Sequence, residues 1–241
     1  EAVRRRTPSA NWFQATDRTT GRLCELRVLS LAGASPAQRA RWRRETRRRR
    51  LIHPALVRVV SAAEAGDLAW IVTDAGLDEV SLEEVVLREG ALPALRLARL
   101  ALDLVRGLDV IHSQGLVHRS VAPTSVLVAD DGRGDTARLA DLGLAANLHG
   151  DDDDGAGVTG SGEVLGDPRY CAPEARGGAG DARADLYALG KTLAFALTGR
   201  PPLGEALEGW TSVRLEIADA PGGLVDLLRG MTDPDPALRP A

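Results

Sequence analysis

The sequence reads VHRSVAPTSVLV at residues 117–128 and ADLG at residues 140–143. Short strands are predicted at residues 126–128 and 138–140, because each is a short run rich in apolar residues with turn-forming or polar residues beside it. The polar segments at residues 118–120 and 141–143 are the first of an ordered series of motifs that continues to residues 233–240. Together these segments decide the fold.

The flanking segments predict helices and one long loop. Pro93 begins a helix that reaches about His112 and carries leucines near helical spacing. Residues 185–197 form an apolar helix, and residues 224–231 form a short amphipathic one. Residues 143–170 are rich in Gly and Asp and lack periodicity, which predicts a surface loop.

The first part of the chain favours strands. Four are predicted, at residues 12–15, 23–29, 57–62 and 68–73, the first two flanking a hairpin-like turn. Ser35-Pro36 predicts the start of a helix that runs to about residue 50, because Ser is favoured at the N-cap and Pro at the first helical position. Strands thus precede helices, which predicts an α+β fold with two lobes.

Charge is distributed unevenly along the chain. Residues 1–60 hold 15 arginines and four acidic residues, a net of +11, so with a whole-chain net of −4 the remainder carries −15. Lys191 is the single lysine. No run approaches 18 apolar residues, so no membrane span is predicted. Cys24 and Cys171 lack metal-site spacing and are expected to be buried thiols.

The motifs, taken in order, resemble those of a protein kinase domain, in the form of the bacterial Ser/Thr kinases of the eukaryotic type. HRS at 118–120 is similar to a catalytic loop, and DLG at 141–143 to the metal-binding Asp-Phe-Gly motif. GDPRYCAPE at 166–174 is similar to the end of an activation segment. DLYALG at 185–190 is similar to the central helix of the large lobe, and the resemblance ends at DPDPALRP, 233–240.

The resemblance implies that several structural residues are retained. Glu174 and Arg239 match a buried ion pair that ties the activation segment to the large lobe. Asp185 matches the aspartate that holds the catalytic-loop backbone, where His118 and Arg119 are also kept. A buried ion pair is costly to break, so folding alone accounts for these residues.

The same resemblance places substitutions at the nucleotide site. Residues 5–12 stand where the family has its glycine-rich loop, and they contain no glycine. Arg27 stands in place of the phosphate-binding lysine, and Glu45 matches the glutamate on a helix that pairs with that lysine. Trp12 and Glu25 stand where a small valine and alanine normally flank adenine, in a site that also includes Thr73 and Leu127. An indole would fill the slot, and Glu25 would face an apolar base unless it pairs with Arg27.

The catalytic loop departs from the family in the same way. Ser120 stands at the catalytic aspartate, Ala122 at the lysine that neutralises γ-phosphate charge, and Ser125 at the asparagine that binds magnesium. Serine cannot act as a base near neutral pH. Asp141 alone survives as a metal ligand, and one carboxylate without phosphates to share the ion is a poor magnesium site, so neither a metal nor a nucleotide cofactor is expected.

Asp167 stands where the family places a threonine that bonds the catalytic aspartate. Two interpretations follow. In one, Ser120 and Asp167 form a structural hydrogen bond with the polarity of the contact exchanged. In the other, Asp167 supplies a displaced catalytic base.

Two charged segments have no assigned role. Eight arginines lie between residues 39 and 50, and residues 151–154 are all aspartate. The aspartates either form a solvated acidic loop or mimic a phosphate and dock on Arg119 or on the arginine helix. Nucleic-acid binding is not expected, because few aromatic residues accompany the arginines and the pI is acidic.

These features predict a catalytically inactive kinase-like domain, not an enzyme, that regulates or scaffolds a protein partner. That partner is expected to be acidic or a genuine kinase. The alternative is a divergent Ser/Thr kinase or another nucleotide-dependent transferase that uses ATP and magnesium through Arg27 and Asp141. The expected lobes are residues 1–75 and 76–241. We expect a domain of a longer, cytoplasmic protein, free or tethered through a membrane segment elsewhere.

Overall fold

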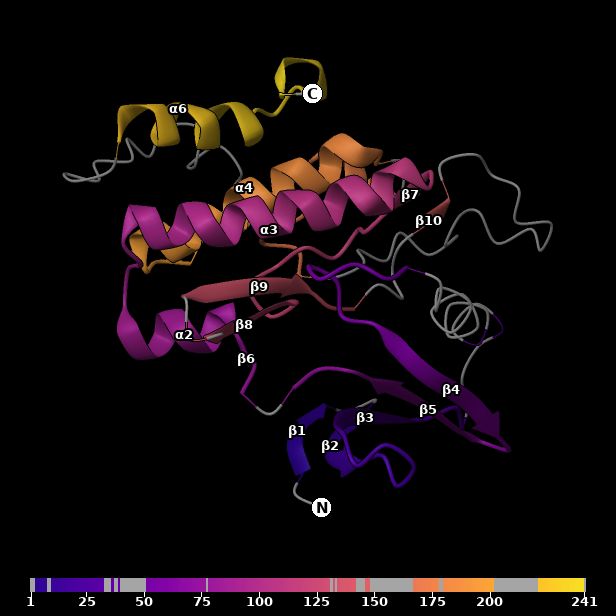
Figure 1. The fold of residues 1–241 in the computed structure, drawn as a ribbon. Coiled ribbons are helices and arrows are strands. Elements are labelled where there is room, and N and C mark those ends of the chain that lie inside the picture. Colours follow the sequence, from indigo (N-terminus) through magenta and orange to yellow (C-terminus); the bar gives the residue numbers. More distant parts are fainter. Residues whose placement is uncertain are drawn as a thin grey trace.

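The computed structural model describes residues 3–7, 10–32, 36, 39, 51–76, 78–130, 132, 134–141, 146–147, 167–177, 180–201 and 221–240. A sheet of the N-terminal strands lies at one end of the molecule, and the long helices lie at the other (Figure 1). This arrangement confirms the predicted two-lobed α+β fold. The expected boundary at 75/76 falls between the strands β5 and β6 and stays a prediction.

The small lobe contains a five-stranded antiparallel sheet in the order β1-β2-β3-β5-β4. Its strands are β1 (Val3–Thr7), β2 (Ala10–Thr16), β3 (Leu23–Ser30), β4 (Val59–Ala65) and β5 (Leu68–Thr73). The turn predicted at residues 17–21 is present, since Gly21 N–H donates to the Asp17 carbonyl at 2.8 Å. Gly21 has φ +69°, a conformation that glycine adopts without strain.

Short strands lie between the sheet and the helices. β6 (Val80–Ser81), β8 (Val126–Asp130) and β9 (Asp135–Leu139) form a three-stranded sheet, and β7 (Leu116–Val117) pairs with β10 (Ala146–Asn147). β10 lies inside the segment predicted to be loop, so that prediction was wrong for residues 146–147. A two-residue strand leaves no periodic pattern in the sequence from which it could be predicted.

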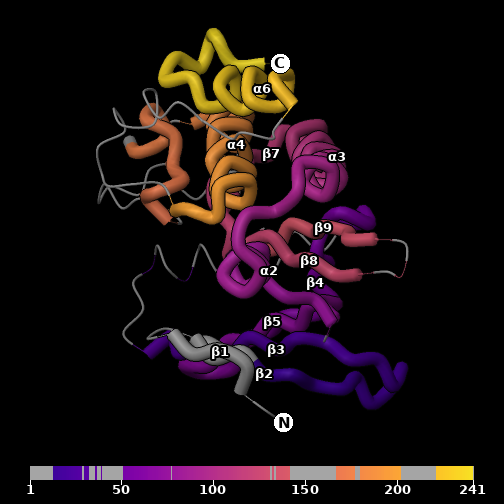
Figure 2. The backbone as a smooth tube through the Cα atoms, turned by 90° about the vertical axis from the view of Figure 1, so that its left-hand side faces the viewer, coloured from indigo at the N-terminus to yellow at the C-terminus, as the bar shows by residue number. Residues whose placement is uncertain are grey.

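Four helices build the described part of the large lobe (Figure 2). They are α2 (Leu82–Glu89), α3 (Ala94–Ser113), α4 (Ala182–Thr198) and α6 (Gly222–Met231). Ser81 caps α2 with a capping box, accepting from the Glu84 N–H while the Glu84 carboxylate accepts from the Ser81 N–H. The helix predicted at residues 36–50 lies outside the described residues, apart from Pro36 and Arg39.

The main core joins the two lobes. Leucines on one face of α3 are fully buried, as their spacing predicts. At Gly107 a β-carbon would lie 3.0 Å from the Ala55 carbonyl and 3.1 Å from the Leu56 side chain, so this glycine lets the segment before β4 approach the helix closely. Leu139 N–H donates to the Ala55 carbonyl at 2.8 Å, which ties that segment to β9.

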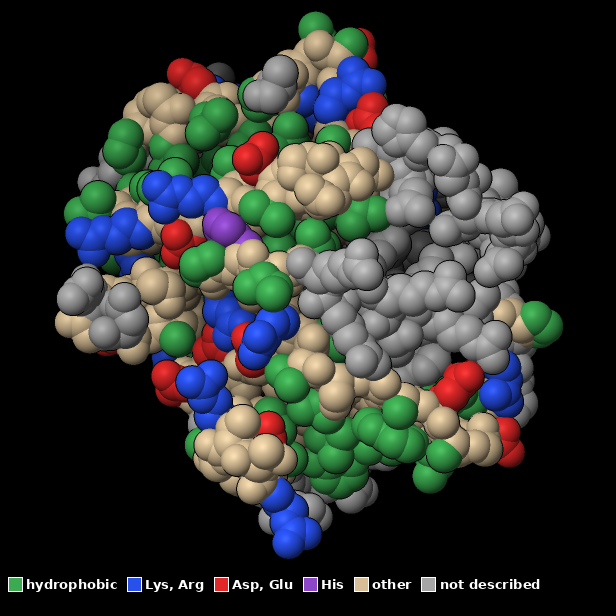
Figure 3. Space-filling view, turned by 45° about the vertical axis from the view of Figure 1, so that its right-hand side comes forward, with side chains coloured by type: hydrophobic (Ala, Val, Ile, Leu, Met, Phe, Trp, Pro, Cys, Tyr) green, Lys and Arg blue, Asp and Glu red, His purple; other side chains and the backbone are tan. Residues whose placement is uncertain are grey.

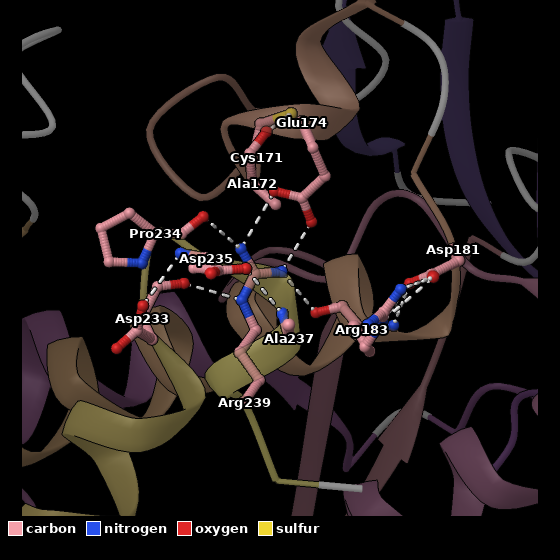
Figure 4. Close-up of polar contacts among 10 residues, drawn as sticks. All are labelled: Cys171, Ala172, Glu174, Asp181, Arg183, Asp233, Pro234, Asp235, Ala237 and Arg239. Carbon is pink, nitrogen blue, oxygen red and sulfur yellow. Dashed lines mark hydrogen bonds and ion pairs between the residues drawn. The ribbon is translucent and has the colours of Figure 1, made fainter.

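The ion pair between Glu174 and Arg239 is present as predicted (Figure 4). Arg239 Nη1 and Nη2 donate to the two Glu174 oxygens at 2.6 and 3.0 Å, and the Arg239 side chain has no exposed surface. The guanidinium also donates to the carbonyls of Asp233 and Arg183. One side chain therefore fixes the activation-segment end against α4 and the C-terminal segment.

The exposed face carries charged side chains of both signs (Figure 3). Acidic and basic side chains lie beside one another on the exposed face in Figure 3, consistent with local pairs such as Arg229–Asp226. None of the helices in the described part has the length and apolar character of a membrane span. Cys24 and Cys171 are free thiols; Cys24 is buried as predicted, whereas Cys171 is half-buried.

Lys191, on α4, is 3% exposed. Its Nζ donates to the Arg169 carbonyl at 2.9 Å and lies 5.3 Å from the centre of the Tyr187 ring. Burial, with the charge of Arg176, lowers the Lys191 pKa from 10.5 to about 8. The folded state therefore releases this proton at lower pH than the unfolded state does.

We predict a pH dependence of stability that Lys191→Met removes. Between about pH 8 and the unfolded pKa of 10.5, the unfolded chain binds more protons at this site, so the wild-type free energy of unfolding rises relative to the variant. The rise is at most about 1.4 kcal/mol per pH unit. Urea denaturation of both proteins at about pH 7.5, 8.5 and 9.5 measures it, and a constant difference between them would contradict the prediction.

Candidate functional site

The loop that follows β7 is held by a buried carboxylate. Asp185, 1% exposed, accepts from the His118 N–H at 2.7 Å, from the Arg119 N–H at 2.8 Å and from His112 Nε2 at 2.8 Å. The predicted role of Asp185 in holding this backbone is confirmed. The contribution of His112 from α3 was not predicted, because a histidine at a helix end is usually read as a surface residue.

His118 connects this loop to the strand that carries Asp141. Its Nε2 lies 2.9 Å from the Ala140 carbonyl, and its Nδ1 accepts from the Ser120 N–H at 3.2 Å. Burial lowers the His118 pKa, so the ring is neutral at neutral pH and can make both bonds. The residue predicted to be structural therefore fixes Ser120 and Asp141 relative to each other.

Two residues at the site have strained backbone. Arg119 has φ +65° and Asp141 has φ +60°, and these are the non-glycine residues with positive φ in the described part of the chain. Such conformations cost free energy and persist where the surrounding structure enforces them, often at active sites. Here Asp185 and His118 supply that enforcement.

The substituted positions in the loop have defined contacts. Ser125 is buried, and its hydroxyl donates toward the Ser120 carbonyl at 2.8 Å and accepts from the Ala122 N–H at 3.0 Å. Ala122 is buried in the main core. Ser120 is half-buried, and no described residue hydrogen-bonds its hydroxyl. Ser125 thus braces the loop, and the Ser120 hydroxyl is available to a ligand.

Arg27 and Asp141 meet across the two lobes. Arg27 Nη1 lies 3.4 Å from Asp141 Oδ1, with the arginine side chain 16% and the aspartate side chain 41% exposed. Arg27 lies on β3, and Asp141 follows β9 after one intervening residue, Ala140. A cation and a carboxylate from different lobes therefore come together at this point.

The other residues assigned to the nucleotide site lie on the strands around this pair. Glu25 is half-buried on β3, two residues from Arg27, so both side chains emerge on the same face of the sheet. Thr73 ends β5, and Leu127 lies on β8 opposite Ser81. Trp12 pairs with Arg27 in the β2–β3 ladder, but its side chain lies outside the described part. Pairing of Glu25 with Arg27 stays a prediction.

The predicted hydrogen bond between Ser120 and Asp167 is wrong. The Asp167 carboxylate instead accepts from Arg169 at Nε and Nη2, at 3.0 and 2.6 Å, and from the Arg169 N–H at 3.0 Å. A partner two residues away closes a very small loop and so competes well with a distant serine. The interpretation of Asp167 as a displaced base stays a prediction.

Three other predicted features lie outside the described residues. These are Glu45, the arginine cluster between residues 39 and 50 apart from Arg39, and the aspartates at 151–154. Arg39 itself bonds the Leu31 carbonyl at 2.9 Å and Asp67 at 3.1 Å. Among the described residues, no group of three or more His, Cys, Asp or Glu side chains is placed to hold a metal ion by itself.

Comparison with protein families matches residues 9–240 to the family described as "Protein kinase domain". The chain belongs to this family. Among its relatives, the serine/threonine-protein kinase pkn2 of Myxococcus xanthus is 34% identical over 214 residues, 83% of this chain. Serine/threonine-protein kinase PknB of Mycolicibacterium smegmatis is 34% identical over 69% of this chain. The chain spans about a quarter of the length of these relatives.

The expectation that this kinase domain is not an enzyme is wrong. Its relatives are named serine/threonine protein kinases, and the match covers the segments in which the catalytic loop and Asp141 lie. The substituted side chains indicated lost functions in the sequence, whereas the backbone geometry at Arg119 and Asp141 and the contact of Asp141 with Arg27 are features of the folded chain.

We predict that Asp185→Asn destabilises the kinase domain. An amide presents one acceptor oxygen where the carboxylate presents two, so one buried backbone N–H loses its partner, at a cost of about 2–3 kcal/mol. Urea denaturation measures the loss. The matched control is Asp226→Asn, whose side chain is 75% exposed and whose change is expected to stay within about 0.5 kcal/mol. Equal effects of the two substitutions would contradict the prediction.

Proposed function

We propose that this chain is a divergent nucleotide-dependent phosphotransferase of the Ser/Thr protein kinase family, with a protein hydroxyl as acceptor. The observation that carries the proposal is the Arg27–Asp141 contact of 3.4 Å across the lobes. The names of the relatives support the same reaction class. The proposed cofactors are ATP and magnesium.

The residues at this contact fit a nucleotide with its metal. Magnesium commonly takes one or two protein carboxylates and completes its shell with water and phosphate oxygens, so Asp141 alone is a sufficient protein ligand for a nucleotide-bound ion. At 41% exposure its carboxylate has room for those ligands. When bound, magnesium would supply positive charge to the phosphates. Arg27 keeps the positive charge of the usual lysine and offers a planar, forked donor that suits phosphate.

The transfer itself needs little covalent help from the protein. The bond from the γ-phosphorus to the bridging oxygen of ADP breaks, a bond from phosphorus to the acceptor oxygen forms, and the acceptor proton passes to water. Phosphoryl transfer proceeds through a loose transition state, so positioning and charge supply most of the catalysis. Ser120 can hydrogen-bond the acceptor hydroxyl but cannot take its proton at neutral pH, so a slow rate is expected.

Binding is tested by thermal denaturation with ATP and magnesium. Ligand at about 100 Kd stabilises a protein by about 2.7 kcal/mol, which raises Tm by roughly 5–10 °C for a chain of this size. We expect the wild-type shift to fall by more than half in Arg27→Met and Asp141→Asn. Arg27→Lys is expected to retain it, as is the control Arg22→Met, whose exposed arginine lies at the β2–β3 turn.

Transfer is measured with γ-labelled ATP and the purified chain together with a mixed protein substrate. We expect label on protein with the wild-type chain and its loss with Asp141→Asn. No thermal shift of the wild-type chain at millimolar nucleotide would overturn the proposal. A shift without transfer to any protein would limit the function to nucleotide binding.

A further inference from the structure

The segment that joins the lobes, residues 74–79, is held by a cluster of charged side chains. The Glu79 side chain is 7% exposed, and its two oxygens lie 3.0 and 3.2 Å from Arg138 Nη1. Arg138 comes from β9 in the large lobe, so the pair joins the end of this segment to that strand. A carboxylate is rarely buried to this degree unless it is paired, as Glu79 is with Arg138.

Asp74, at the start of the segment, extends the cluster to the small lobe. Arg138 Nη2 donates to Asp74 Oδ1 and to the Leu56 carbonyl, the latter at 3.1 Å. The Arg58 N–H, just before β4, donates to the same Asp74 oxygen at 2.9 Å. The joining segment therefore bonds both lobes through side chains.

The cluster also engages the peptide groups of the segment. The Gly76 N–H donates to Glu79 Oε2. The Asp74 carbonyl accepts from Arg138 Nη1 at 3.4 Å, and the Asp74 N–H donates to the Arg58 carbonyl at 3.0 Å. Charged side chains thus bond one donor and one acceptor of the backbone, and a carboxylate acceptor makes the bond to Gly76 a strong one.

The segment formed by residues 74–79 lies next to two residues that were assigned to the nucleotide site. It begins after Thr73, the last residue of β5, and ends at β6, where Ser81 pairs with Leu127. Thr73 and Leu127 are two residues assigned to the nucleotide site, and the segment connects the strand that carries Thr73 to the strand that pairs with Leu127, so it borders the position proposed for the base. Backbone N–H and C=O groups are the usual polar partners that orient such a ligand.

We infer that Glu79 and Arg138 bond the backbone groups, the Gly76 N–H and the Asp74 carbonyl, with which a nucleobase would otherwise form hydrogen bonds. Glu79 thereby limits the affinity of this chain for nucleotides. The inference rests on the proposed function. A base gains the Gly76 N–H only when the Glu79 carboxylate leaves it. Glu79 keeps Arg138 as a partner after that movement, because a carboxylate has several acceptor positions.

The test compares two ligands on two variants. Glu79→Ala removes the carboxylate that bonds the Gly76 N–H, and Arg138 retains Asp74 as a partner. Titration calorimetry with ATP and magnesium should show about a tenfold gain in affinity over wild type, the equivalent of one hydrogen bond to a charged group. Inorganic tripolyphosphate has no base, so its affinity should be the same in both proteins.

The control is Glu83→Ala, which removes a half-buried carboxylate from the first turn of α2 and should leave both affinities unchanged. Glu79→Gln, which keeps the side-chain size and weakens the bond to Gly76, should give a smaller gain of about threefold and serves if Glu79→Ala does not fold.

The outcomes separate the two proposals. If wild type binds ATP and neither Glu79 variant binds it more tightly, the inference is wrong and the proposed function stands. An equal gain for tripolyphosphate also overturns the inference, because it would indicate a general loosening of the cleft. If ATP binds to a Glu79 variant alone, the inference is supported. If it binds to none of the proteins, both proposals fail.

Discussion

Asp185 carries a negative charge inside the large lobe, and the geometry of the site depends on how that charge is satisfied. Two backbone N–H groups of the loop and the His112 ring bond it. A buried carboxylate without such donors would cost several kcal/mol, so the loop cannot move away from α4 without a large penalty. His118 transmits this constraint to Ala140, and Asp141 is thereby placed facing Arg27.

The loop at residues 118–125 is held by hydrogen bonds to its backbone that do not all require the side chains usual in the family. Ser125 braces the loop with a single hydroxyl that bonds three backbone groups. The loop is thus held by Ser125 although the side chains at 120, 122 and 125 differ from those that the family resemblance implies. Because phosphoryl transfer depends on charge and position more than on a proton acceptor, Arg27 and Asp141 are the basis of the slow reaction that we propose.

Features governed by short-range patterns or by the family motifs could be predicted from the sequence. The capping box at Ser81, the α3 leucines and the Glu174–Arg239 pair follow from fixed spacings or from an ordered set of motifs. The partner of Asp167 was predicted wrongly, because Arg169 lies nearer in the chain than the serine favoured by analogy.

The pairing of Glu79 with Arg138, 59 residues apart, could not be predicted. The chain has 29 arginines once its single lysine is subtracted from 30 basic residues, and no local pattern distinguishes one of them as the partner. Contacts of this kind depend on how the two lobes meet, and that information is in the packing of β9 against the joining segment.

The position of Lys191 has a practical consequence for chemical labelling. It is the single lysine of the sequence; in the folded chain the residue is 3% exposed and its amine bonds the Arg169 carbonyl. Amine-reactive dyes and cross-linkers therefore meet no accessible lysine side chain on the native domain. Acylation at this residue reports the opening of α4 from the activation-segment end, which makes the rate of lysine labelling a direct measure of local unfolding in the large lobe.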